Sequence, residues 1–282
     1  MKNVIVTPPV YYPLVLDQAK DHLRVDHSND DKNIQSLISV ATNRVEQFTR
    51  RRLITQTWYT YLDEWPDEDY LTLPFGQLQS VTSVKYTDSS NTEILTFTDA
   101  SLSTTDDFDV DINSDPGRVI LVYGDSWPSV VLWPMNPIKI EFVCGYGANA
   151  VQAITAASNA SPIVITIAGH GYLTGDEVYI YSVTGNTAAN GTWIITKASD
   201  NTFSLNGSDG NAAWVSGGSC VKQSVPPNII HAIKLHLTDL YENRESFFAG
   251  QGFTVTKFGT IESLLFPYRI PITREALQGL YK

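Results

Sequence analysis

The sequence predicts an α+β fold: a helical core, an antiparallel β region and an inserted all-β domain. Two stretches at opposite ends of the chain carry apolar residues at helical spacing, and short runs rich in β-branched and aromatic residues lie between them. A third segment, in the second half, is poor in charge and rich in glycine. The 282 residues, 43% of them hydrophobic, are enough for one or two ordinary domains.

Three helices are expected, over about residues 17–23, 28–51 and 227–246. The second has the clearest pattern, with Ser28 and Asp31 in the form of a capping box and Arg50–Arg52 at its end. The third begins at the Pro226-Pro227 pair, because proline is tolerated in the first turn of a helix. The stripe of the second helix consists of Ile34, Leu37, Ile38, Ala41, Val45 and Phe48.

Residues 54–143 predict about six antiparallel strands, each short and bounded by Pro, Gly, Asp or Ser. Asp115-Pro116-Gly117 is a strong turn signal between two of them. The strands are expected at 54–62, 70–73, 81–86, 93–97, 118–123 and 138–143.

Residues 148–222 predict a small inserted all-β domain, which divides the first domain into residues 1–147 and 223–282. The segment has six charged residues and nine of the 18 glycines, with strand signals at 163–167, 177–181, 193–197 and 202–205. Cys144 and Cys220 lie at its two ends. Two cysteines are too few for a disulfide framework or a zinc site, so buried thiols in a protein made in a reducing compartment are favoured.

The charge distribution argues against tight binding of nucleic acid. The net charge is −11, and residues 1–149 carry 21 acidic groups against 11 basic ones. Proteins that grip DNA need the opposite sign, whereas a surface past which DNA must slide would be acidic. No apolar stretch approaches the length of a membrane span, and the first residues lack the pattern of a secretory signal.

The sequence contains no convincing catalytic, metal or cofactor motif. Asp107, Asp109 and Asp111 match the opening of a calcium-binding EF-hand loop, but Ile112 and Arg118 stand where Gly and Glu are required. A Gly-x-Gly-x-x-Ala run at 145–150 lacks the helix of a dinucleotide fingerprint. The five histidines make no pair with Cys, Asp or Glu at metal-ligand spacing. We therefore expect a protein that is not an enzyme and has no cofactor.

Several segments, taken in their order along the chain, form a recognisable set: Leu16–Val25, Val45–Thr49, Arg52–Trp58, Asp115–Ile120, Gly124–Pro128, Val143–Gly147, Pro226–Ala232, Leu240–Glu245 and Leu264–Arg269. Together they resemble the head–tail connector (adaptor) family of long-tailed bacteriophages. The resemblance covers roughly residues 14–147 and 223–270, and the inserted segment interrupts it. The insertion is similar to a small β module of phage structural proteins and distantly resembles the β-barrel half-domain of ubiquitin-activating enzymes.

The resemblance implies a non-enzymatic subunit of a homo-oligomeric ring at the head–tail junction of the virion, synthesised in the cytoplasm of the host bacterium. Such rings are usually dodecamers that lie beneath the portal protein. They extend the channel through which double-stranded DNA passes without tight binding, and they dock stopper or tail-completion proteins. No membrane is involved.

Two groups of residues are candidates for these roles. Carboxylates that line or rim the channel would repel DNA and let it slide, and the candidates are Asp63, Glu64, Asp67, Glu68 and Asp69. The candidates for contact with the portal or a neighbouring subunit are Arg50, Arg51, Arg52, Leu264, Leu265, Phe266, Tyr268, Arg269, Leu277, Leu280 and Tyr281. The last three lie in a C-terminal segment too short to be a stable helix alone, which suits ordering upon docking.

The alternative from another class is a β-rich module of a tail-associated protein that binds carbohydrate or a host surface. Its stacking platforms would be Tyr172, Tyr179, Tyr181, Trp193 and Trp214. Aromatic residues at strand positions more often belong to a core, which favours the connector interpretation.

Overall fold

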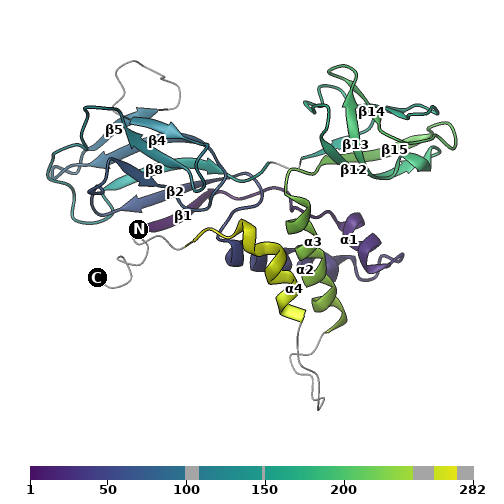
Figure 1. Cartoon of the computed structure of the whole chain (residues 1–282), viewed down its shortest axis with the longest axis horizontal. Helices are drawn as coiled ribbons and strands as arrows, with labels where there is room; N and C mark the ends of the chain where they lie inside the picture. The colour runs from purple at the N-terminus through teal and green to yellow at the C-terminus, as the bar shows by residue number, and fades with distance from the viewer. Residues whose placement is uncertain (99–107, 148–149, 244–256, 272–282) are drawn as a thin grey trace, which may run out of the picture.

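The computed structural model describes residues 1–98, 108–147, 150–243 and 257–271. It confirms a mixed α+β architecture with three separate hydrophobic cores: one between helices, one between two sheets of the first half and one inside the inserted segment. Figure 1 shows the two β parts at opposite ends of the molecule, with the helices beneath and between them.

The helical part consists of α1 (Leu16–Leu23), α2 (Asp31–Thr49), α3 (Pro227–Glu242) and α4 (Lys257–Leu265), followed by the 3-10 turn η2 (Phe266–Tyr268). Ile34, Ile38 and Val45 of α2 are buried against Ile229 and Ile233 of α3. The helical core is therefore built from two stretches of chain separated by about 180 residues.

The capping box expected at Ser28 does not form, and α2 begins at Asp31. The two carboxylates at this end bind side chains of other elements: Asp31 pairs with Lys20 at 2.8 Å, and Asp30 accepts a hydrogen bond from the Tyr241 hydroxyl at 2.7 Å. The helix ends at Thr49, since Arg50 adopts the left-handed conformation with φ 58°. Tertiary partners thus replace the local cap.

The first β part contains a five-stranded antiparallel sheet in the order β1-β2-β8-β4-β5 and a three-stranded sheet in the order β3-β7-β6. Their buried residues form one core, which includes Val84, Phe108, Val119, Ile140 and Phe142. The strands are β1 (Lys2–Thr7), β2 (Gln56–Leu62), β3 (Tyr70–Thr72), β4 (Leu78–Thr87), β5 (Glu93–Thr98), β6 (Phe108–Asp111), β7 (Arg118–Leu121) and β8 (Ile138–Cys144).

Six strands were expected between residues 54 and 143, and each of the six occurs close to its expected place. The sequence pattern missed β6 and also β1, which lies ahead of that region and pairs with β2. Every residue of β1 is exposed, so this strand has no buried face to produce an alternating pattern.

The inserted segment folds as one seven-stranded antiparallel sheet around its own core, in the order β10-β11-β14-β13-β12-β15-β9. The strands are β9 (Val151–Ala153), β10 (Ala156–Ala157), β11 (Val164–Thr166), β12 (Glu177–Thr184), β13 (Gly191–Lys197), β14 (Thr202–Leu205) and β15 (Ser216–Lys222), with a 3-10 turn η1 (Thr187–Ala189). We refer to residues 150–222 as the β module.

The two ends of the β module lie side by side. A side chain at Gly147 would meet the Ser224 hydroxyl oxygen at 2.3 Å, so the chain leaves and returns at almost the same place. Cys144 and Cys220 are both buried and free, and they belong to two different cores. Burial raises the pKa of each thiol to about 12.

Candidate functional site: assembly surfaces and an interdomain cleft

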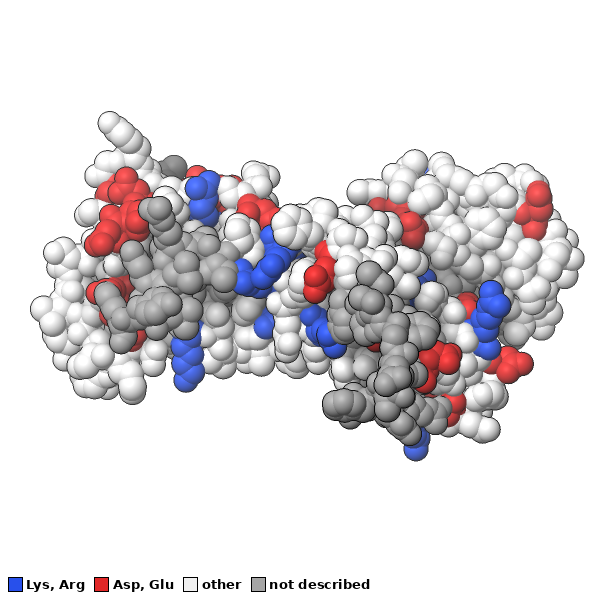
Figure 2. Space-filling model, turned by 60° about the horizontal axis from the view of Figure 1, so that its bottom comes forward, with Lys and Arg blue, Asp and Glu red and all other residues white. Residues whose placement is uncertain are grey.

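The five candidate channel carboxylates lie together in the segment between β2 and β3, and all five side chains are exposed. The segment is fixed by contacts to the chain between β7 and β8. Asp63 accepts a hydrogen bond from the Asn136 backbone amide at 3.0 Å, and the Glu68 carbonyl accepts one from the Trp127 indole at 2.8 Å. Figure 2 shows Asp and Glu side chains gathered over this end of the molecule.

The three arginines expected to bind a partner all contact this chain itself. Arg51 is 6% exposed and makes a bidentate ion pair with Asp115, and it also donates to the Tyr268 carbonyl. Arg50 donates to the Ile270 carbonyl at 3.1 Å, and Arg52 pairs with Glu46 at 2.9 Å. These contacts join the end of α2 to the β part and to the segment after α4.

The candidate contact residues near the C-terminus fall into three groups. Leu265 is buried in the helical core, with Leu264 and Tyr268 packed against that core. Arg269 lies over the Phe48 ring, whereas Phe266 is 70% exposed and free to meet another molecule. Leu277, Leu280 and Tyr281 lie outside the residues that the structure describes.

Asp111 of the partial EF-hand pattern and the nearby Asp115 are engaged by basic groups. The Asp109 carboxylate accepts a hydrogen bond from the Val110 backbone amide, and Asp107 lies outside the described residues. Asp111 pairs with Arg118 at 2.8 Å and accepts hydrogen bonds from Ser114, which hold the pKa of this carboxyl well below its usual range. Asp115 belongs to the ion pair with Arg51. Across the described parts of the chain, no three metal-ligating side chains come together.

The aromatic residues of the carbohydrate-binding alternative are buried or half-buried. Tyr172 belongs to the core of the β module, and Trp193 and Trp214 pack against that core. Tyr172 and Tyr179 are each 4% exposed, and half-buried Tyr181 stacks on Tyr179. The Trp193 indole donates to the Ala189 carbonyl at 3.0 Å, and the Trp214 indole donates to the Gly217 carbonyl at 3.1 Å. None of the five is fully exposed, which disfavours the sugar-binding alternative.

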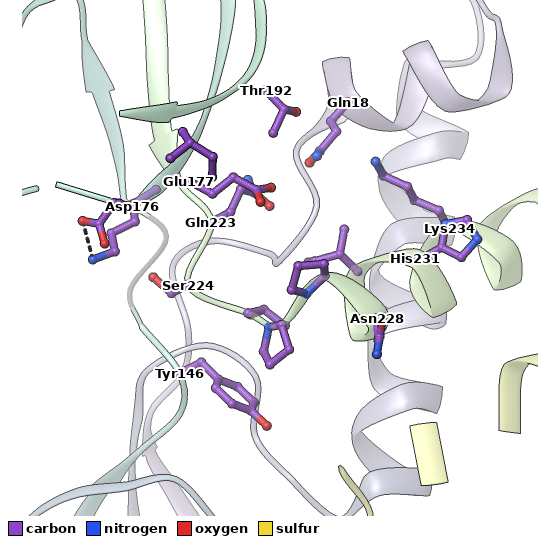
Figure 3. Close-up of a pocket in the computed structure, with 17 residues that line it drawn as sticks. Gln18, Tyr146, Asp176, Glu177, Thr192, Gln223, Ser224, Asn228, His231 and Lys234 are labelled. Atoms are coloured by element: carbon purple, nitrogen blue, oxygen red, sulfur yellow. Dashed lines mark ion pairs between the residues drawn. The ribbon is translucent and has the colours of Figure 1, made fainter. Parts of the chain in front are cut away.

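A cleft of about 790 Å³ separates the β module from the helices, and the sequence pattern gave no sign of it. Gln18 of α1, Glu177 of β12, and His231 and Lys234 of α3 line it (Figure 3). The Asp176–Lys222 ion pair, with an N–O distance of 2.7 Å, closes one end. Burial lowers the pKa of Lys234.

The cleft contains buried polar atoms without a hydrogen-bond partner, namely Oε1 of Gln18 and Nε2 of Gln223. Its walls mix these amides with apolar residues such as Ile230 and with both signs of charge. This composition is typical of a junction between two folded parts. One direct hydrogen bond spans the same junction, from the Tyr179 hydroxyl to the Asp21 carboxylate at 2.8 Å.

The surface features that the described residues present are exposed carboxylates, exposed apolar side chains and an interdomain cleft. No helix in the described ranges is long and apolar enough to span a membrane.

A comparison with protein families gives the class of protein that the chain resembles. Residues 14–114 match the phage gp6-like head-tail connector protein family, so the predicted resemblance is confirmed. No curated protein matches the sequence.

Solved structures with a similar fold come from the neck of a gene transfer agent (GTA) particle. A chain from the neck of the empty particle, computed with C6 symmetry, is 16% identical with a TM-score of 0.56. A chain from the native virion is 17% identical with a TM-score of 0.55, and one from the native neck, computed with C12 symmetry, is 16% identical with a TM-score of 0.54. Each similarity covers 97% of both chains, so it includes the β module.

Proposed function

We propose that this chain is a structural subunit of a virion neck, where copies form a ring between the head and the tail. The observation that carries the proposal is the agreement between the connector-family match and a fold shared over 97% of the chain with neck subunits. Neck structures with C6 and C12 symmetry support a homo-oligomeric ring. The ring would lie beneath the portal protein, extend the DNA channel and dock stopper or tail-completion proteins.

The role is structural in this proposal, with chemistry limited to contacts between proteins. Ring closure needs a head-to-tail interface, in which each copy uses two different surfaces. Fixed geometry at the joint between the helices and the β part, where Arg51 binds Asp115 and Tyr268, would keep those surfaces in register.

Particles that lack this chain test the proposal. We expect heads that package DNA but carry no tails, because the surface on which the tail assembles is missing, and we expect the wild-type gene to restore tailed particles. Electron microscopy and infection or transfer titres measure both. Tailed, DNA-filled particles assembled without the chain would contradict the structural role.

We further propose that Asp63, Glu64, Asp67, Glu68 and Asp69 border the channel and keep DNA from adhering. All five are exposed on one segment, which supports this arrangement. Replacing Asp67 and Asp69 by Lys would introduce phosphate-binding cations, and DNA release should then slow at low salt and recover at high salt. Asp209→Lys on the β module, also exposed, is the matched control. Release unchanged in the Lys variant at low salt would contradict the channel role.

The C-terminal segment is the other proposed contact, since Leu277, Leu280 and Tyr281 are apolar residues on a stretch too short to fold alone. Removing residues 271–282 should weaken attachment of the ring to heads that carry the portal. Attachment at wild-type level would rule the segment out as a docking element.

A further inference from the structure

Exposed large apolar side chains are concentrated in two segments of the described structure. Of the 18 such side chains, 12 lie in residues 1–12 and 122–135, which we call the N-terminal arm and the apolar loop. Contiguous exposed apolar surface of this kind marks a protein contact more often than chance. The arm contributes Met1, Val4, Ile5, Val6, Val10 and Tyr12, and the loop contributes Val122, Tyr123, Val130, Val131, Trp133 and Met135.

The N-terminal arm contacts the rest of its own chain mainly through the pairing of β1 with β2. Among the described residues, strand β1 pairs only with β2, and all six of its own residues are exposed, so no described element covers either of its faces. Pro8 and Pro9 follow it, and the buried core begins only at Leu14. Since β1 is the outermost strand, one side of its backbone is also unpaired, which invites contact with another chain.

The apolar loop, in contrast, has a fixed backbone and exposed side chains. The Trp127 ring stacks on Trp65 at a centroid distance of 5.0 Å. The Val131 carbonyl accepts a hydrogen bond from the Ser89 amide at 2.9 Å, and the Trp133 amide donates to the Thr87 carbonyl at 3.0 Å. Val131 nevertheless remains 75% exposed. The loop therefore presents a formed apolar surface.

The two segments meet the five-stranded sheet at different strands. The arm forms the β1 edge, whereas Trp133 and Val131 are bonded to Thr87 and Ser89, at the end of β4 and in the turn that follows it. Three strand spacings of about 4.8 Å separate β1 from β4 by about 14 Å, so the arm and this part of the loop lie apart within one chain. Two different surfaces on one chain are what a head-to-tail contact requires.

Charge favours a second copy of this chain as the occupant. Each copy carries a net charge of −11, so copies repel one another wherever their acidic surfaces face. Residues 3–16 and 126–138 contain no charged side chain, and they make up most of the two segments. A contact between identical acidic chains is least opposed where the facing surfaces are uncharged and apolar.

We infer that the N-terminal arm of one copy packs against the apolar loop of the next, and that this contact closes the ring. The inference rests on the proposed ring-forming function and adds the two surfaces that make the interface. The exposed edge of β1 then lies in the interface between the two copies, where the neighbouring copy contacts both its apolar side chains and its unpaired backbone groups.

Sedimentation velocity of the purified full chain tests the inference. Val10→Asp and Val131→Glu each place a charge on one of the two surfaces, at positions 81% and 75% exposed. We expect both variants to remain monomers at concentrations where the wild-type chain assembles. Leu173→Glu and Val215→Glu, 62% and 70% exposed on the β module, are matched controls and should assemble like wild type. Circular dichroism checks that every variant is folded.

A mixture of the two variants gives the sharpest result. Val131→Glu keeps an intact arm and Val10→Asp keeps an intact loop, so one contact can still form and the mixture should sediment as a dimer that grows no further. A mixture that stays monomeric, either variant assembling like wild type, or controls that fail equally would overturn the inference. A wild-type chain that is monomeric at all concentrations would also overturn it while leaving the neck function untouched, since particles that lack the chain test that separately.

Discussion

The helical core and the β module bury similar kinds of residues but are built in opposite ways. The core of the β module comes from one continuous stretch, with Ile163, Val178, Phe203 and Cys220 among its fully buried residues. The helical core joins α2 to α3 across the whole inserted segment. The β module can therefore fold from contacts within residues 150–222 alone. The helical core forms only when α3, which follows the module in the chain, packs against α2.

This difference indicates how an insertion is tolerated. The helical core requires that the two ends of the module meet, and the contact between Gly147 and Ser224 meets that requirement. A direct hydrogen bond from Tyr179 to Asp21 also joins the two parts, beside the cleft that lies between them, and we propose that each part unfolds as a unit of its own.

The largest expected effect separates the two units directly. Ile233→Ala in α3 removes a fully buried side chain and should destabilise the helical part by about 2–5 kcal/mol. Ile165→Ala, equally buried in the module, is the matched variant. Hydrogen exchange should show each substitution loosening only its own unit, and a single transition shifted equally by both would refute the comparison.

A smaller effect is expected at the joint between the helices and the β part. Arg51→Ala leaves Asp115 and the Tyr268 carbonyl without their donor, at a cost of about 2–3 kcal/mol. Lys139→Ala, which removes an exposed ion pair with Glu93, should cost under about 1 kcal/mol. Urea unfolding measures both. Equal losses of unfolding free energy in the two variants would mean that the Arg51 contacts stabilise the fold no more than an exposed ion pair does.

The hydrogen bond between the β module and the helices should contribute less to stability than the Arg51 contacts do. Tyr179→Phe removes the hydrogen bond to Asp21 and should cost about 1 kcal/mol. If that bond couples the two units, Asp21→Ala combined with Tyr179→Phe should cost less than the sum of the two single substitutions. Additive costs in this double-mutant cycle would show that the bond carries no coupling.

Acid should weaken the helical part slightly more than the module. Burial lowers the pKa of His236 in α3 below its ordinary value, so the folded state binds this proton less readily than the unfolded state. The stability that comes from keeping His236 neutral is fully present above pH about 6.5. It is lost as the pH falls toward the pKa of His236 in the folded state. His236→Gln should flatten that loss in unfolding measurements between pH 7.5 and 5.5, and an unchanged slope would contradict the assignment.

Removing the module should change the helical part least of all. A chain in which Gly147 is joined to Ser224 by a short glycine linker in place of residues 148–223 should keep its helices, because those ends already adjoin. Circular dichroism and thermal unfolding measure this, and residues 150–222 expressed alone should fold as well. Loss of the helical transition in the shortened chain would show that the module is an integral part of one unit.

Local patterns in the sequence were enough to predict most of the fold. Helix α3 begins at Pro227 as expected, and the strong β-branched and aromatic runs became strands. The start of α2 was misjudged because Asp30 and Asp31 bind Tyr241 and Lys20, partners that only the tertiary structure supplies.

The candidate sites were harder to predict than the fold. Arg50–Arg52 looked like a free basic run, yet each arginine finds its partner within the chain, from residues between 6 and 220 positions away. The N-terminal arm and the cleft gave no signal, because exposure on both faces and the meeting of distant segments leave no periodic pattern.

A cryo-EM reconstruction of the neck of particles that contain this chain tests its assignment most directly. The account predicts a closed ring of this subunit between the head and the tail, with its helices, its two-sheet β part and its β module fitted into the repeating density. A neck fully accounted for by other proteins, or this chain found at another position in the particle, would contradict it.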